Sequence, residues 1–128
     1  MNIIKYDKLK RIYYVDSFWK EYRSLFGKSE RDFFDYSKKL ISNLSFLDNI
    51  KNMQLALQNP NIEKLVNTPL YSIRHRSKLN PRVIFICCMG SEDNPGAIIL
   101  LASILEKSAS DYSRAIDKAT LIIKNFEE

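Results

Sequence analysis

The spacing of apolar side chains changes from a helical to a strand-like period near residue 70. Between residues 17 and 66 apolar positions recur every three to four residues, which is typical of amphipathic helices. From Leu70 the side chains alternate, and two almost uncharged runs follow, RVIFICCM and AIILLASIL. Runs that are apolar on both faces are typical of central strands. We therefore expect one domain over residues 1–128, with a helical segment at 17–66 and a sheet followed by a helix at 70–126.

The helical segment contains signals for three helices and a short turn. The expected ranges are 17–26, 29–44, 45–58 and, for the helical turn, 62–66. Asp16 or Ser17 can cap the first helix, and Gly27 can end it. The second and third helices each begin with a serine that is followed three positions later by an aspartate, as in a capping box. Asn59-Pro60 is the expected end of the third helix.

Four segments are expected to form strands. Residues 11–15, RIYYV, are rich in β-branched and aromatic types, and the later strands begin at Leu70, Arg82 and Ala97. Alternation from Leu70 would place Arg74 and Arg76 on one face and His75 on the other. The expected fold class is α+β, a small and mostly antiparallel sheet of one N-terminal and three C-terminal strands. We expect helices on one face of it and the first strand beside the later three.

Turn signals divide the C-terminal segment. Asn80-Pro81 predicts a turn, and the stretch from Gly90 to Gly96 is the expected hairpin loop. Ser110 or Asp111 can cap the last helix. Tyr112 belongs to the apolar stripe of that helix, so a packed core role is as well supported as a functional one.

Positive charge is concentrated in one short stretch. Residues 70–82 contain Arg74, Arg76, Lys78 and Arg82 and no acidic residue. Such a concentration favours a polyanionic partner. The alternative is a solvated strand edge, where cations discourage aggregation.

Composition excludes several other classes of site and location. Cys87 and Cys88 are adjacent and would point to opposite faces of a strand, so they cannot form an ordinary disulfide with each other. One histidine, His75, adds too little for a metal site, and we expect neither a metal nor a cofactor. No apolar run is long enough to span a membrane, and the N-terminus lacks the features of a secretory signal. A cytoplasmic protein with reduced thiols is expected.

The order of residue types in the C-terminal half resembles a known family. A basic strand leads through a turn to an arginine that opens a hydrophobic hairpin, and a lysine at the strand end precedes an amphipathic helix. The corresponding pieces lie at 74–78, 80–85, 105–108 and 111–115. This pattern is similar to that of the RelE/ParE superfamily of bacterial toxins from type II toxin–antitoxin pairs, including the HigB branch and its phage relatives. The resemblance covers residues 70–126 best.

The resemblance implies a RelE-like microbial RNase fold and an activity. Members that act on messenger RNA cleave it on the ribosome without a metal, by attack of the 2′-hydroxyl on the neighbouring phosphate. Arg82 would face that phosphate, and the further catalytic residues would be Arg74, Arg76, Lys107 and Tyr112. Lys78 and His75 would contact RNA, and His75 is also the obvious acid–base candidate by its intrinsic pKa. The implied partners are a cognate antitoxin and messenger RNA on the ribosome.

Two other functions remain open at this point. One is a ParE-like toxin without nuclease activity that inhibits DNA gyrase, and the other is an inactive, phage-derived relative that only binds. Glu106 stands where the family has a second cation, and an acid beside an RNA site is unfavourable. The position of His75 opposite the arginines favours a structural role for it. Arg82 is expected at the surface, so that Arg82→Ala would leave folding intact.

Overall fold

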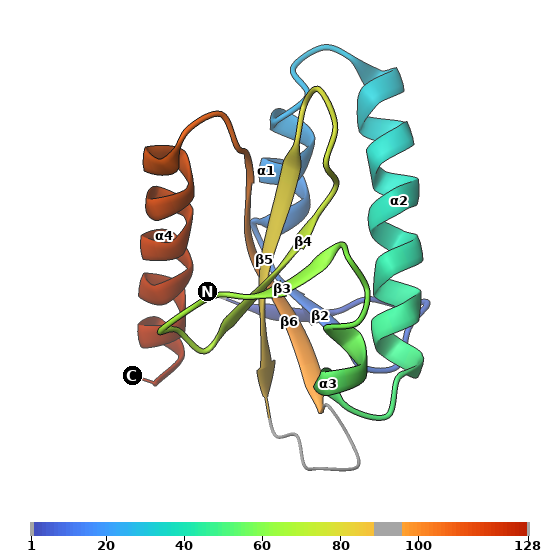
Figure 1. Cartoon of the computed structure of the whole chain (residues 1–128), viewed down its shortest axis with the longest axis vertical. Helices are drawn as coiled ribbons and strands as arrows, with labels where there is room; N and C mark the ends of the chain where they lie inside the picture. The colour runs from blue at the N-terminus through green and yellow to red at the C-terminus, as the bar shows by residue number, and fades with distance from the viewer. Residues whose placement is uncertain (1, 89–95, 128) are drawn as a thin grey trace.

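The computed structural model describes residues 2–88 and 96–127, which form a central sheet with helices on both sides (Figure 1). Its elements are, in chain order, β1 Ile3–Lys5, β2 Ile12–Val15, α1 Phe18–Ser24, α2 Glu30–Asn49, α3 Met53–Ala56, β3 Ile62–Lys64, β4 Leu70–Arg74, β5 Pro81–Cys88, β6 Ala97–Leu105 and α4 Ala109–Glu127. The expected loop at 90–96 lies, apart from Gly96, outside the described residues. The α+β class expected from the pattern is confirmed.

The six described strands form one sheet in the order β1-β2-β6-β5-β4-β3. The N-terminal strand β2 lies beside β6, as expected, and is parallel to it, with Ile12 opposite Ile98. The other described pairings are antiparallel. Strands β1 and β3 extend the sheet at its two edges and were not expected. Each has only three residues, too few for a period to be recognised.

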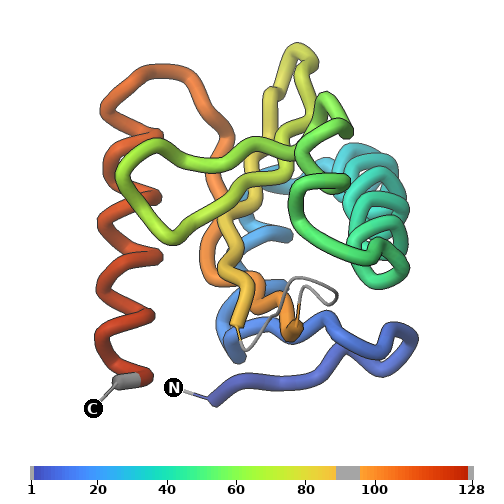
Figure 2. Tube along the Cα trace, turned by 60° about the horizontal axis from the view of Figure 1, so that its bottom comes forward, coloured from blue at the N-terminus to red at the C-terminus, as the bar shows by residue number. Residues whose placement is uncertain are grey.

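Helices cover both faces of the sheet, so the expectation of helices on one face is wrong. Helix α4 lies on one side, and α1 and α2 lie on the other, in both views (Figures 1 and 2). Because β5 and β6 are apolar on both faces, each face has to be covered to remove it from water. None of the described helices has both the length and the apolar composition needed to cross a membrane.

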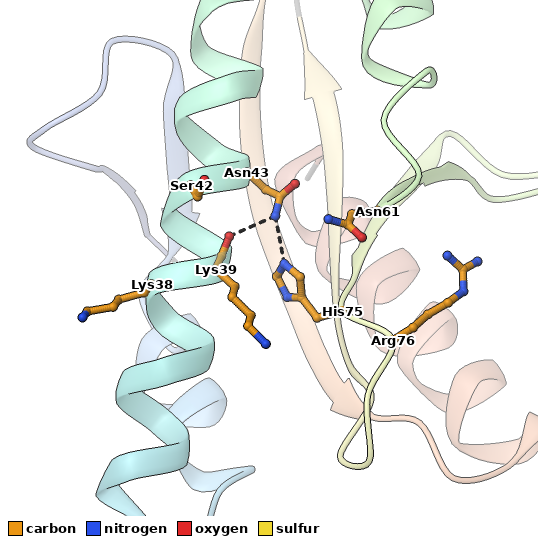
Figure 3. A pocket seen from close by; sticks show the side chains of 7 residues that line it. All are labelled: Lys38, Lys39, Ser42, Asn43, Asn61, His75 and Arg76. Carbon is orange, nitrogen blue, oxygen red and sulfur yellow. Dashed lines mark hydrogen bonds between the residues drawn. The ribbon is translucent and has the colours of Figure 1, made fainter.

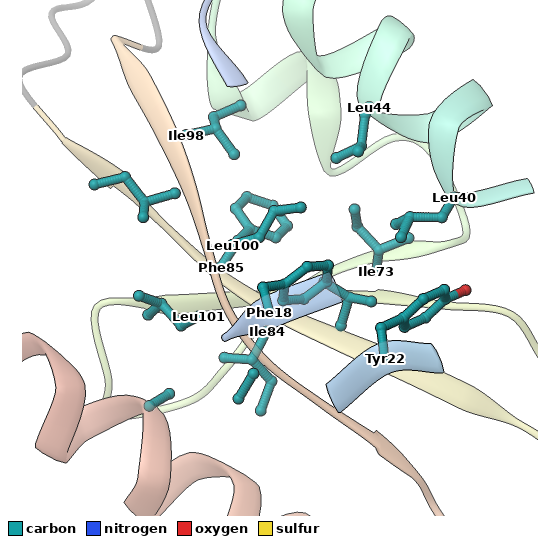
Figure 4. Close-up of a cluster of buried hydrophobic side chains, with 14 of the residues drawn as sticks. Phe18, Tyr22, Leu40, Leu44, Ile73, Ile84, Phe85, Ile98, Leu100 and Leu101 are labelled. Atoms are coloured by element: carbon teal, nitrogen blue, oxygen red, sulfur yellow. The ribbon is translucent and has the colours of Figure 1, made fainter. Parts of the chain in front are cut away.

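The core between the sheet and α1 and α2 is rich in large side chains. Phe18 and Tyr22 of α1 lie beside Leu40 of α2 and above the strands (Figure 4), and all three are completely buried. Full burial of such a side chain contributes about 1.5–3 kcal/mol. The aromatic rings continue from Tyr22 through Phe26 to Tyr36, with centroids 5.3 and 5.4 Å apart. This row of rings connects α1 to α2 and holds α2 against the sheet.

The two helices expected at 29–44 and 45–58 are instead one long helix, α2, followed by the single turn α3. Ser29 caps α2 as expected, its Oγ accepting from the N–H of Asp32. The carboxylate of Asp48, which was read as part of a second cap, accepts the backbone N–H of Arg11 at 2.7 Å. The Arg11 guanidinium in turn donates to the carbonyls of Leu47 and Ile50, at 3.3 and 2.9 Å. These carbonyls lack helical partners, so the contact stabilises the end of α2.

The expected helical turn at 62–66 is also wrong, because residues 62–64 form β3. Ile62 lies opposite Ile73 of β4 and is 3% exposed. Pairing with the free edge of β4 satisfies backbone groups that a single helical turn would leave open. Strand β3 matters for the site because it places Glu63 beside the turn that follows β4.

Candidate functional site

The sheet register brings two of the expected arginines together. Arg74 of β4 lies opposite Arg82 of β5, and Arg82 lies opposite Ile104 of β6. Directly opposed residues point to the same face of a sheet. Glu106 follows Ile104 by two positions. All four side chains therefore belong to the face that α4 covers.

Arg82 is enclosed by an acid and an aromatic ring. Its Nη2 lies 2.9 Å from Oε2 of Glu106, and its side chain is 4% exposed. The guanidinium carbon lies 4.2 Å from the centre of the Tyr112 ring, which gives a cation–π contact. The expectation that Arg82 is a surface residue is wrong, because Glu106 balances its charge and Tyr112 covers it.

Arg74 reaches the same carboxylate from the neighbouring strand. Its Nε lies 3.8 Å from Oε2 of Glu106 and donates to Oδ1 of Asn80 at 3.3 Å. The side-chain amide of Asn80 also donates to the Glu106 carbonyl at 3.3 Å. Asn80 has a φ of 52°, in the left-handed region that asparagine tolerates. The expected turn is thereby tied to the end of β6.

Helix α4 begins earlier than expected, at Ala109. The Ser108 hydroxyl accepts the N–H of Asp111 at 3.4 Å, and the Asp111 carboxylate accepts the N–H of Lys107 at 3.2 Å. The bond from Lys107 is the main cause that holds the pKa of the Asp111 carboxyl below its ordinary value. This cap places Tyr112 in the first turn, where its ring covers Arg82.

We refer to Arg74, Arg82, Glu106 and Tyr112 as the Glu106 cluster. Three of them were expected as site residues, and the structure brings these three together. The family pattern makes Glu106 an unfavourable substitution, yet it is the centre of the cluster. Two features of the sequence point to this role of Glu106: it precedes Lys107 at the end of the last strand, and Arg82 opens the neighbouring strand. Lys107 is next in the chain, but its side chain lines a separate pocket of about 480 Å³ with Arg114 and Lys118.

Arg76 does not join the Glu106 cluster, so the expected common face of Arg74 and Arg76 is wrong. Strand β4 ends at Arg74, and the alternation ends with it. The Arg76 guanidinium lies 2.9 Å from Glu63 of β3 and donates to the Pro60 carbonyl at 3.1 Å. Lys78 is exposed near the tip of the β4–β5 turn. The expected RNA contacts thus lie around the turn and not on a single sheet face.

His75 lines a second pocket, between α2 and the β4–β5 turn. This pocket, which we call the His75 pocket, has a volume of about 510 Å³ and is lined by Lys38, Lys39, Ser42, Asn43, Asn61, His75 and Arg76 (Figure 3). Among the described residues, none that lines this pocket is acidic. His75 points away from Arg74 and toward α2, as the alternation of β4 predicted.

Asn43 determines the tautomer of the neutral His75 ring. Its Nδ2 donates to the Lys39 carbonyl at 2.9 Å and lies 2.8 Å from Nε2 of His75. Its Oδ1 accepts from the Asn59 amide at 3.4 Å. With this assignment of the amide, Nε2 of His75 accepts and the proton of the neutral ring is on Nδ1. Burial, together with the nearby Lys39 ammonium, lowers the pKa of His75.

The turn itself is fixed to α2. The hydroxyls of Tyr36 and Ser77 lie 2.6 Å apart, and the N–H of Asn80 donates to the Ser77 oxygen at 3.1 Å. Two side chains of α2, Tyr36 and Asn43, therefore hold the turn on one side, while Glu106 holds it on the other. These hydrogen bonds hold the backbone of the turn, and with it Arg76 and Lys78, in a fixed position.

Other candidate chemistry is weak in the described residues. Cys87 and Cys88 are free thiols, and burial raises the pKa of Cys87 to about 12. A thiol with a raised pKa is a poor nucleophile at neutral pH. Within residues 2–88 and 96–127, no group of three His, Cys, Asp or Glu side chains could hold a metal ion.

Comparison of the chain with protein-family models, with curated proteins and with solved structures found no match. The candidate function therefore depends on the geometry of the two sites and on the residue pattern of the C-terminal half.

Proposed function

We propose that the chain is a RelE/ParE-type toxin that cleaves messenger RNA on the ribosome. One observation carries this proposal: of the residues that the resemblance implies, Arg74 and Arg82 meet at the Glu106 carboxylate, and Tyr112 covers Arg82. Cleavage by the 2′-hydroxyl needs a base, cations and an acid. The Glu106 cluster contains a carboxylate, two guanidinium cations and a phenol, which can fill these roles.

The proposed chemistry assigns one role to each group. Glu106 takes the proton of the 2′-hydroxyl, whose oxygen then attacks the neighbouring phosphorus. Arg74 and Arg82 stabilise the additional negative charge, for which the planar guanidinium is suited. Tyr112 gives its proton to the leaving 5′-oxygen. The products are a 2′,3′-cyclic phosphate and a 5′-hydroxyl. Glu106 then releases its proton to water and Tyr112 takes one up, so that both groups return to their starting state.

Access to the cluster is unequal. The side chain of Arg74 is 26% exposed and that of Glu106 is 18% exposed, whereas that of Arg82 is 4% exposed. In this proposal a phosphate first contacts Arg74. The Tyr112 ring then moves from Arg82 onto a base of the RNA, where stacking replaces its cation–π contact. The ribosome would supply the ordered RNA, and a cognate antitoxin would cover the basic turn.

A second candidate function is binding without cleavage. The specific observation in its favour is that Glu106 balances Arg82 and Tyr112 covers it, which leaves Arg82 no free surface for a phosphate. Such a protein would be a ParE-like inhibitor of DNA gyrase or an inactive relative. In both cases the Glu106 cluster would serve only to join α4 to the sheet.

The test is induced expression in a bacterial host without any neighbouring gene. We expect the wild type to stop growth with loss of messenger RNA, and Glu106→Gln and Tyr112→Phe to permit growth. Glu30→Gln is the matched control, because Glu30 is 84% exposed on α2 and far along the chain from the cluster. All variants are checked for soluble expression and for an unchanged circular dichroism spectrum.

The alternatives give different results in the same test. Growth arrest with filamentation and DNA damage, unaffected by Glu106→Gln, would indicate the gyrase inhibitor. Normal growth with abundant soluble wild type would contradict both toxin functions.

A further inference from the structure

The His75 pocket lies on the opposite side of the sheet from the Glu106 cluster. It is built from α2, the residues before β3 and the β4–β5 turn (Figure 3). The proposed cleavage reaction uses none of its groups. Its polar side chains and its cations therefore need a separate explanation.

The floor of the pocket is polar, buried and fixed in position. His75 is 9% exposed and Asn43 is 8% exposed, and they contact each other. Asn59 extends the network, accepting the N–H of Asn61 on its Oδ1 at 2.9 Å. The Asn61 carbonyl accepts the N–H of Arg74 at 2.7 Å, which ties this loop to β4. Fully bonded polar networks are rigid, so the lining is pre-organised.

Several groups at the rim are open for a ligand. Within the described residues, the Ser42 hydroxyl and the Asn61 side-chain amide have no hydrogen-bond partner, and the Lys39 ammonium has no carboxylate partner. Lys39 instead lies over the Tyr36 ring, 5.0 Å from its centre. Arg76 lies beyond Asn61 in the close view and forms an ion pair with Glu63 (Figure 3).

A histidine with a fixed tautomer is suited to binding and not to acid–base catalysis. Nε2 of His75 is occupied by Asn43, and the proton on Nδ1 of a neutral ring is too weakly acidic to be transferred near pH 7. The remaining Nδ1–H is a donor next to the Lys39 ammonium. The pocket therefore offers an ammonium, an imidazole N–H, an amide and a hydroxyl.

We propose that the His75 pocket binds a nucleoside phosphate unit of single-stranded RNA. Lys39 pairs with the phosphate, which Nδ1–H of His75 also contacts, and Asn61 hydrogen-bonds to the base or ribose. This inference rests on the proposed function in that the RNA is the same molecule that reaches the Glu106 cluster. The exposed Lys78 belongs to the β4–β5 turn, which contacts the pocket through His75 and the cluster through Asn80.

Two kinds of molecule contain a phosphate joined to a nucleoside, namely a free mononucleotide and an RNA chain. A free mononucleotide offers one phosphate, whereas an RNA chain would also reach the exposed Lys78, which lies outside the lining of the pocket. The uneven charge of the chain, with no acid among residues 70–82, favours the polymer.

The experiment measures binding of a fluorescein-labelled single-stranded oligoribonucleotide to the purified protein by fluorescence anisotropy over a range of salt concentrations. We expect Lys39→Gln to weaken binding roughly fivefold and to reduce the salt slope by about 0.7, the value for one phosphate contact on a single strand. Asn61→Ala should weaken binding without changing the slope, because it removes a neutral donor. Lys124→Gln, an exposed lysine near the end of α4, is the control with the same change of charge.

Equal binding by the Lys39→Gln and Lys124→Gln proteins would overturn the inference, as would wild-type protein that does not bind the oligoribonucleotide. Adenosine monophosphate distinguishes the two kinds of molecule. If adenosine monophosphate displaces the oligoribonucleotide from the wild type but not from Lys39→Gln, the pocket also binds a free nucleotide. If adenosine monophosphate does not displace the oligoribonucleotide, although Lys39→Gln weakens RNA binding, the pocket binds the polymer. Binding requires no cleavage, so a failure of the growth test leaves this result unaffected.

Discussion

Nδ2 of Asn43 lies 2.8 Å from Nε2 of His75, and this bond joins residues 32 positions apart in the chain. It fixes helix α2 to the end of β4 and sets the tautomer of the neutral imidazole. Both consequences can be measured, because His75 is the only histidine of the protein.

The first prediction concerns the pH dependence of stability. Burial, and secondarily Lys39, lowers the pKa of His75 below its ordinary value of 6.5, so the unfolded chain binds a proton more readily than the folded one. The stability that His75 contributes is therefore complete above pH 6.5 and is lost as the pH falls through the folded pKa. Urea unfolding of the wild type should show this loss as the pH falls below about 6.5. His75→Gln removes the titration, and parallel curves for the two proteins would contradict the prediction.

The second prediction concerns the donor on Asn43. Asn43→Ala leaves Nε2 of His75 and the Asn59 amide without their partner, and we expect a loss of about 2 kcal/mol of unfolding free energy. The pKa of His75 should rise, because the bond to the neutral ring is gone. Urea unfolding and an NMR titration of the single imidazole measure these effects. Asn49→Ala, which removes an exposed bond to the Ser45 carbonyl in the same helix, should change neither quantity appreciably.

The third prediction is that Arg82→Ala destabilises the fold. The substitution leaves the Glu106 carboxylate without its closest cation and removes the surface on which the Tyr112 ring packs. Removal of one partner from a buried ion pair costs about 3 kcal/mol. Arg31→Ala should cost at most about 0.5 kcal/mol, because Arg31 is 91% exposed in its pair with Asp35. Equal midpoints for both variants in urea would show that the Arg82 pair contributes nothing.

The fourth prediction separates backbone conformation from side-chain bonding at two asparagines. Asn80 and Asn67 both have positive φ, 52° and 62°, and glycine accepts that conformation. Asn80→Gly also loses the bonds to Arg74 and to the Glu106 carbonyl, so it should destabilise by about 1–2 kcal/mol. Asn67→Gly should stay within about 0.5 kcal/mol of the wild type. Similar midpoints in thermal unfolding would mean that the Asn80 bonds do not stabilise the turn.

The sequence pattern predicted the parts of the fold that repeat with a regular period. The strand before α1, the apolar hairpin from Arg82 and the C-terminal helix were all recognised in this way. The predictions that were wrong concern residues whose structure depends on contacts with distant parts of the chain. Asp48 resembled a helix cap, but its carboxylate is occupied by the N–H of Arg11, 37 positions away.

At the candidate site, too, some features could be predicted from the sequence and others depend on distant contacts. The resemblance implied five catalytic residues, of which the structure brings Arg74, Arg82 and Tyr112 together at the Glu106 cluster, whereas Arg76 and Lys107 lie elsewhere. The burial of Arg82 could not be predicted, because it depends on Glu106 and on a helix that packs over the strand. The sequence likewise does not reveal that Asn43 faces His75, since no local pattern links α2 to β4.

The most direct test of the central claim is cleavage of a defined messenger RNA in a reconstituted translation reaction. We predict that the wild-type protein cuts the RNA only when ribosomes translate it, producing fragments with 2′,3′-cyclic phosphate and 5′-hydroxyl ends, and that Glu106→Gln with an unchanged fold does not. An intact messenger RNA in the presence of folded wild-type protein would contradict the assignment of the Glu106 cluster as a catalytic site.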